Sequence, residues 1–182
     1  YLPKIMFKFY YLTILLLLSH FIFSQFNYTF SALNGTYNSI ETGTIAPLTA
    51  SFSPNRPILD EGFSNNLPIG FTFQYNGINY NSIHLNTNGF VSLGAPFLGS
   101  TILDPAFDIN ELRSSAGNKV ITKPILAPFW DNLLLNSAAD LTYITNGSAP
   151  NRVFTAQWKN AIWQSGSSAI SFQLKLYETN NI

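Results

Sequence analysis

The chain of 182 residues contains no cysteine, only two histidines and few charged residues. Without cysteine there is no disulfide, no thiol nucleophile and no thiolate zinc site, so stability has to come from a hydrophobic core. Charged residues make up 10% of the chain, well below the roughly 25% that is usual in globular domains. The surface is therefore expected to consist mostly of Asn, Ser, Thr, Gln and Gly, which suits an extracellular β protein.

Positive charge is also scarce. After residue 24, seven Lys and Arg face nine Asp and Glu, because Lys4 and Lys8 lie before that point. Phosphate binding needs clustered cations that release counterions, and the sequence shows no such cluster. We therefore expect no nucleic-acid partner.

The one long apolar run lies at the start of the chain, where Lys4 and Lys8 precede FYYLTILLLL (9–18) and a small residue follows at Ser24. This is the order of a secretory signal peptide, and we predict one over residues 1–24, with the true start at Met6. The alternative is a membrane anchor, which needs roughly 20 apolar residues, more than the uninterrupted run provides. The mature protein is expected to be secreted or to lie at the cell surface, and to meet the membrane only during export.

Aromatic residues are plentiful, at 15% of the chain with 16 Phe and 9 Tyr, and such side chains bury the largest apolar areas. Residues 25–182 are long enough for one domain with a substantial core. Because the chain stops at Ile182 directly after a turn-like stretch, we expect this domain to be truncated at its C-terminal end.

Apolar and polar residues alternate with a period of two along most of the mature chain. The clearest case is a hairpin in which Phe71, Phe73 and Tyr75 alternate with polar residues before a tight turn at Asn76-Gly77. A second turn is expected at Asn88-Gly89. Further strands are expected at 83–87, 90–93, 125–130, 141–145, 153–159 and 170–177. The sequence predicts an all-β protein, an antiparallel β-sandwich or jelly-roll-like fold, with an N-terminal signal helix and at most one short helix near 105–115.

Five segments carry a resemblance to a known type of domain. They are LPIGFTFQYNG (67–77), NTNGFVSLG (86–94), ILAPFWD (125–131), APNRVFTAQWKN (149–160) and FQLKLYET (172–179). In this order they resemble the N-terminal β-sandwich module of secreted bacterial surface proteins associated with type IX secretion and fibronectin type III repeats. The APFWD stretch is also similar, more loosely, to the nidogen-like extracellular domain. The resemblance implies an exported surface module and supplies no catalytic residue, because these segments consist of turns and core aromatics.

Candidate catalytic and metal-binding residues are few. His84 is the one histidine left after the signal peptide, and we expect it to be solvated or bonded to a turn on the polar face of its strand. Asp104, Asp108 and Glu111 lie close together in sequence and suit either a glycosidase pair or solvated loop residues. Asp104 and Asp108 with Asn110 would also suit calcium, which is the one cofactor that the sequence leaves open.

Aromatic side chains raise the question of sugar binding. Trp130 and Trp158 follow apolar patterns and are expected to be structural, whereas Trp163 lies toward a loop and is the candidate ligand-binding residue. Asp131, with Asn132, suits either a calcium site or a turn that its carboxylate closes, and we favour the turn.

We therefore interpret the sequence as a non-catalytic, exported β-sandwich that serves as an interaction or spacer module in a larger cell-surface or secreted protein. Its expected role is adhesive or glycan-binding. Its expected partners are downstream domains of the same polypeptide and an extracellular glycan or protein. The alternative is an accessory or catalytic domain of an extracellular polysaccharide-acting enzyme, such as one associated with a glycoside hydrolase. That alternative requires two carboxylates that converge in a cleft beside an aromatic platform.

Overall fold

The computed structural model describes residues 30–51, 57–94, 124–163, 166 and 168–179. The predicted signal peptide (1–24), the helix expected near 105–115 and the candidate residues Asp104, Asp108, Asn110 and Glu111 lie outside the described residues. Among the helices of the described part, none is long and apolar enough to cross a membrane. The chain divides into two compact units, residues 1–35 and 36–182. Of the first unit, residues 30–35 are exposed coil, and every described strand belongs to the second unit.

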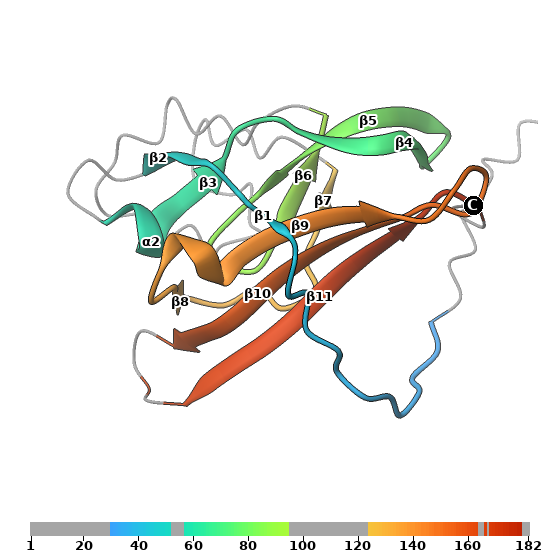
Figure 1. Ribbon diagram of the computed structural model, residues 1–182. Helices are drawn as coiled ribbons and strands as arrows, with labels where there is room; N and C mark the ends of the chain where they lie inside the picture. Colours follow the sequence, from blue (N-terminus) through green and yellow to red (C-terminus); the bar gives the residue numbers. More distant parts are fainter. Residues whose placement is uncertain (1–29, 52–56, 95–123, 164–165, 167, 180–182) are drawn as a thin grey trace, which may run out of the picture. The chain divides into compact units, whose positions relative to one another are not determined.

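The larger sheet is antiparallel and has five strands (Figure 1). Its order is β1 (Thr44–Ile45), β9 (Leu141–Asn146), β10 (Val153–Trp163) and β11 (Ala169–Tyr177), with β8 (Leu133–Leu134) paired to the end of β10. The register of β10 and β11 shifts between Trp158 and Ala161. There Asn160 adopts a positive φ of 55° and its backbone N–H donates to Ser171 Oγ at 2.9 Å. This bulge lets β10 run further than the alternation in its sequence predicted.

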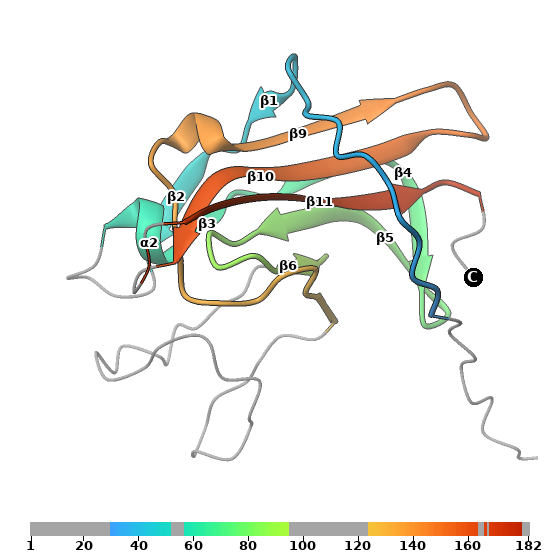
Figure 2. The same cartoon turned by 90° about the horizontal axis from the view of Figure 1, so that it is seen from below.

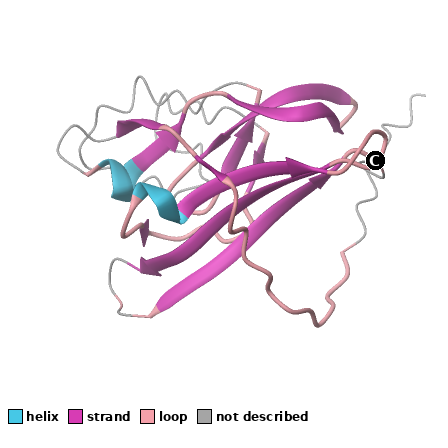
Figure 3. Ribbon diagram, in the orientation of Figure 1, coloured by secondary structure: helices cyan, strands magenta, loops and turns pink. Residues whose placement is uncertain are grey.

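The other strands form a second layer, and Figure 3 shows that strands predominate over helices in the described part of the chain. Its main sheet contains β4 (Leu67–Tyr75), β5 (Ile78–Leu85), β6 (Val91–Leu93) and β7 (Ile125–Leu126), paired in that order. A two-stranded sheet of β2 (Leu48–Ser51) and β3 (Gly62–Ser64) continues it through a bridge between Phe63 and Asn86. Two short helical turns, α2 (Ile58–Glu61) and η1 (Ala138–Asp140), occur where the sequence predicted no helix.

The hairpin of β4 and β5 confirms the strongest local prediction. Tyr75 pairs with Ile78, and the two turn residues Asn76 and Gly77 both have positive φ angles, 55° and 74°. Such a turn matches the right-handed twist of its strands, which is why Asn-Gly is favoured there. Buried and exposed residues alternate along β4 as the sequence indicates.

The core lies between the two layers. Phe154, Ala156 and Trp158 on β10 are fully buried and form one cluster with Ile69 and Leu85 of the opposite sheet. Trp158 also stacks on Phe172 of β11 with ring centroids 4.9 Å apart. These contacts confirm the antiparallel sandwich, and they confirm that Trp158 is structural.

Three polar contacts join the layers at backbone carbonyl groups. Thr145 Oγ1 donates to Ile69 O at 2.8 Å, and Trp158 Nε1 donates to Asn86 O at 2.8 Å. The guanidinium of Arg152 donates to Gly70 O. Because each carbonyl belongs to the sheet that faces the donor, these bonds fix the position of one layer over the other.

Candidate functional site

The outer face of the larger sheet carries the polar residues that alternate with the core residues. Gln157 of β10 lies directly opposite Thr142 of β9 on one side and Gln173 of β11 on the other. A row of this kind is expected to be solvated, because it faces away from the core. Instead Gln157 is 1% exposed and Thr155, two residues before it, is 7% exposed. Another part of the chain therefore covers the sheet at this point.

The cover is residues 37–42, which we call the strap. Figure 2 shows this segment crossing the strands of the larger sheet on its way to β1. The strap lacks regular secondary structure, so its backbone groups need partners elsewhere.

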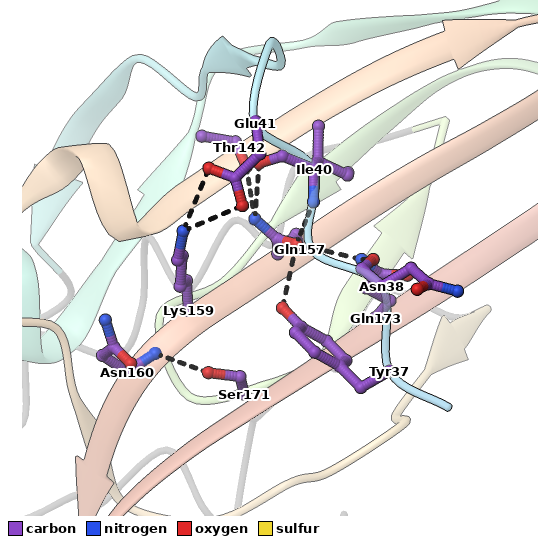
Figure 4. Close-up of polar contacts among 10 residues, drawn as sticks. All are labelled: Tyr37, Asn38, Ile40, Glu41, Thr142, Gln157, Lys159, Asn160, Ser171 and Gln173. Carbon is purple, nitrogen blue, oxygen red and sulfur yellow. Dashed lines mark hydrogen bonds and ion pairs between the residues drawn. The ribbon is translucent and has the colours of Figure 1, made fainter. Parts of the chain in front are cut away.

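Gln157 supplies most of those partners, as Figure 4 shows. Its Oε1 accepts hydrogen bonds from Tyr37 Oη at 2.9 Å and from the backbone N–H of Ile40 at 2.7 Å. Its Nε2 donates to the carbonyl of Ile40 at 3.2 Å. Gln173 Nε2 donates to the carbonyl of Asn38 at 2.7 Å and to Gln157 Oε1 at 2.9 Å. The two glutamines thus hold the strap much as a neighbouring strand would.

One ion pair extends this attachment. Lys159 Nζ lies 3.4 Å from Glu41 Oε1, also drawn in Figure 4. The nearby hydroxyl of Ser39, followed by the hydrogen bond and charge of Lys159, lowers the pKa of Glu41. Glu41 is therefore ionised at neutral pH, and its charge is balanced by a lysine of the sheet.

Beside the strap lies a groove of about 270 Å³. β9, β10 and β11 contribute to its lining from below and the strap forms one wall. The polar side chains that matter for its chemistry are Asn38, Glu41, Asn146, Thr155, Gln173 and Lys175. Together they offer carboxamides, a hydroxyl, a carboxylate and an ammonium group. Such a groove can bind a polar ligand through several hydrogen bonds, and we take it as the candidate functional site.

Trp163, the tryptophan proposed from sequence, lies elsewhere, at the end of β10. It is half-buried, and its Nε1 donates to Asp131 Oδ2 at 2.7 Å. Its ring meets the edge of Phe129 with centroids 5.6 Å apart. The indole N–H is therefore bonded within the protein, and a ligand role for Trp163 remains a prediction. The other oxygen of Asp131 accepts the backbone N–H of Asn132 at 2.8 Å, which agrees with the predicted turn.

The expectation that His84 is solvated was wrong, because its side chain is 5% exposed. β3 lies against the end of β5, where Ser64 Oγ accepts the backbone N–H of Leu85 at 2.9 Å. Nδ1 of His84 lies 3.1 Å from the carbonyl of Ser64. The small sheet of β2 and β3 thus covers a face that local alternation marks as polar.

The Asn88-Gly89 turn is buried as well, and it spans more residues than a two-residue hairpin. Asn86 N donates to Phe90 O at 2.9 Å, and Asn88 Nδ2 donates to Glu61 Oε2 at 3.1 Å. Asn88 Oδ1 accepts the backbone N–H of Leu133 at 2.9 Å. These side chains connect α2, β5 and β8, so the motif is structural. In the described part of the chain, no three His, Asp or Glu side chains are grouped to hold a metal ion.

Comparison with known proteins adds one finding to this geometry. A family model described as NIDO related matches residues 27–182. No curated protein and no solved structure matches the chain. The family match agrees with the nidogen-like resemblance of the sequence motifs and supports an extracellular type of domain. Because the match covers nearly all of the chain, including every strand described above, this protein belongs to the NIDO-related family.

Proposed function

We propose that this chain is a non-catalytic, exported interaction or spacer module of a larger cell-surface or secreted protein. The observation that carries the proposal is the NIDO-related match over residues 27–182, because it identifies an extracellular type of domain by its whole length and not by a short motif. The order of charge, apolar run and small residue in residues 1–24 supports export. Type IX secretion is the route that we propose from the resemblance of the motifs.

The contacts made by side chains of the segments 86–94 and 149–160 support a non-catalytic role. Asn88 bonds to Glu61 and to the backbone of Leu133, while Trp158 bonds to the carbonyl of Asn86. All are interior contacts that maintain the fold, and none presents a reactive group to a cleft. A catalytic site needs a nucleophile or an acid and base within reach of a substrate. The groove instead has one carboxylate, Glu41, whose charge is balanced by Lys159.

We further propose that the outer face of the larger sheet is the binding face, with an adhesive or glycan-binding role. A rigid sheet holds its side chains in fixed positions, and the strap adds polar groups on one side. The groove residues come from three adjacent strands and the strap, so a ligand there would meet groups that folding has already positioned.

The proposal is tested by producing the intact chain with its N-terminal segment in a bacterial host and by following both its location and its chemistry. We expect the chain outside the cytoplasm with a new N-terminus at Gln25. We also expect no new reducing ends when the purified protein is incubated with polysaccharides. Retention of the uncleaved chain in the cytoplasm would contradict export. Release of reducing ends that scales with protein concentration would contradict the non-catalytic role and favour the polysaccharide-acting enzyme.

A further inference from the structure

We propose that the groove beside the strap binds a carboxylated saccharide, such as a uronic acid unit of an extracellular polysaccharide. This inference rests on the proposed function as an extracellular interaction module, and it names the ligand class and the residues. Four observations on the groove carry it: a hydroxyl on its floor, a cation that forms no ion pair with the described residues, two amide groups with hydrogen-bonding capacity to spare, and an exposed tyrosine on the same face.

The hydroxyl belongs to Thr155, on the floor of the groove. The residue is 7% exposed, and among the described residues its hydroxyl has no hydrogen-bond partner. A hydroxyl in this position can donate one hydrogen bond and accept others, so it can bond to a ligand hydroxyl in the groove. This is the kind of polar group that gives a ligand site its specificity.

The cation is Lys175, which lies directly opposite Thr155 in the register of β10 and β11. The groove contains one acidic residue, Glu41, and Lys159 already lies 3.4 Å from its carboxylate. Lys175 has no ion pair within the described part of the chain. The groove therefore offers one positive charge that remains available, and a carboxylate is the ligand group that matches it.

The carboxamides complete the set. Gln173 uses its Nε2 for the strap, while its Oε1 accepts no hydrogen bond from the described residues. Asn146 is exposed, and its side chain is likewise unbonded among those residues. Acceptors and donors placed side by side in this way suit adjacent hydroxyl groups, each of which both donates and accepts.

Size and surroundings also favour a short saccharide. A volume of about 270 Å³ is slightly below the roughly 300–1,000 Å³ of pockets that bury drug-sized ligands, so the groove suits one or two sugar units of a longer chain. Tyr177 follows Lys175 by two residues and therefore lies on the same face of β11, where it is 52% exposed. An exposed aromatic ring offers an apolar surface to a sugar ring and a hydroxyl to water.

The test is an isothermal calorimetric titration of the purified chain with trigalacturonate. The unmodified protein is expected to bind, and Lys175→Gln to raise Kd about ten- to a hundredfold because a charge-assisted hydrogen bond is lost. Thr155→Val is expected to raise Kd about two- to tenfold, and Thr155→Ser to restore it. The matched control is Thr72→Val, which removes a hydroxyl from the exposed face of β4, outside the groove. It should leave Kd within about twofold.

The neutral trimer of galactose is the companion ligand. Equal affinity for both trimers would overturn the carboxylate assignment, and equal losses from Thr155→Val and Thr72→Val would overturn the site. Circular dichroism and the melting temperature of each variant show that a loss of binding is not a loss of fold. If the chain is exported and non-catalytic but does not bind trigalacturonate, the carboxylated-saccharide assignment is wrong and the proposed function is unaffected. If the chain hydrolyses the trimer, the proposed function itself falls.

Discussion

Gln157 is predicted to supply most of the hydrogen bonds that hold the strap on the sheet. We consider Gln157→Met, which keeps a chain of similar length and removes both polar atoms. Three bonds to the strap are lost, from Tyr37 Oη at 2.9 Å, from Ile40 N at 2.7 Å and to Ile40 O at 3.2 Å. At about 1 kcal/mol for each neutral hydrogen bond, the variant should lose about 3 kcal/mol of unfolding free energy. The residue is 1% exposed, so water replaces these bonds only after the strap moves.

Two measurements check this expectation. Urea unfolding gives the global loss of stability, and native-state hydrogen exchange follows the amide of Ile40, whose partner is the Gln157 side chain. We expect exchange at Ile40 to accelerate strongly in the variant while the amides in the interior of β10 stay protected. Gln74→Met is the matched control, because Gln74 lies exposed on β4 and its side chain bonds to Asn79 at 3.2 Å. A loss below about 0.5 kcal/mol, or unchanged protection at Ile40, would contradict this role of Gln157.

Three further predictions concern stability. Gly89→Ala should lower the free energy of unfolding by about 2–5 kcal/mol. The φ angle of Gly89 is 76°, and the added methyl group would collide with the carbonyl oxygen of Phe129. A melting temperature equal to that of the parent protein would contradict this expectation. Trp158→Phe should lower the free energy of unfolding by about 1–3 kcal/mol, because the carbonyl of Asn86 loses the indole donor and keeps only the N–H of Gly89. An unchanged urea midpoint would contradict this role of the indole. The hydrogen bond with Arg152 lowers the pKa of Glu178 below 4.5, so the folded state releases this proton more readily than the unfolded state. The pair therefore stabilises the fold above pH 4.5 and loses its effect as pH falls through the lowered pKa. The urea midpoints of the parent and Glu178→Gln should differ at neutral pH and converge as pH falls through the lowered pKa of Glu178, and a constant gap would contradict the assignment.

The sequence predicted well those features that depend on neighbouring residues. The hairpin of β4 and β5 follows from Asn76-Gly77, whose positive φ angles need no distant contact. The alternation in β11 likewise predicted which residues face the core. The strand expected at 125–130 was too long, because β7 ends at Leu126, before Pro128, which lacks the N–H that a ladder requires.

The failures share one physical cause, which is a contact made by a residue far away in the chain. His84 follows a regular alternation, yet β3 covers it. Asn88-Gly89 reads locally as a hairpin turn, while its geometry depends on Glu61 and Leu133. Periodicity reports which side of a strand a residue occupies, and it contains no information about what later packs against that side.

The candidate site was missed for the same reason. Gln157 and Gln173 both occur on polar faces in the sequence, but only the register of β10 and β11 places them side by side. The strap that they bind starts 120 residues before Gln157. A usable signal was Gln157 between Ala156 and Trp158 in the middle of a strand, because a long amide there is well placed to bond a covering backbone.

The sharpest test of a non-catalytic module with a binding groove is a ¹H–¹⁵N correlation spectrum of the labelled protein during titration with trigalacturonate. We predict amide shifts that cluster at Thr155, Gln173 and Lys175, together with a trimer that is recovered intact. Shifts that cluster around Trp163 at the other end of β10, or cleavage of the trimer during the titration, would contradict a non-catalytic module that binds its ligand beside the strap.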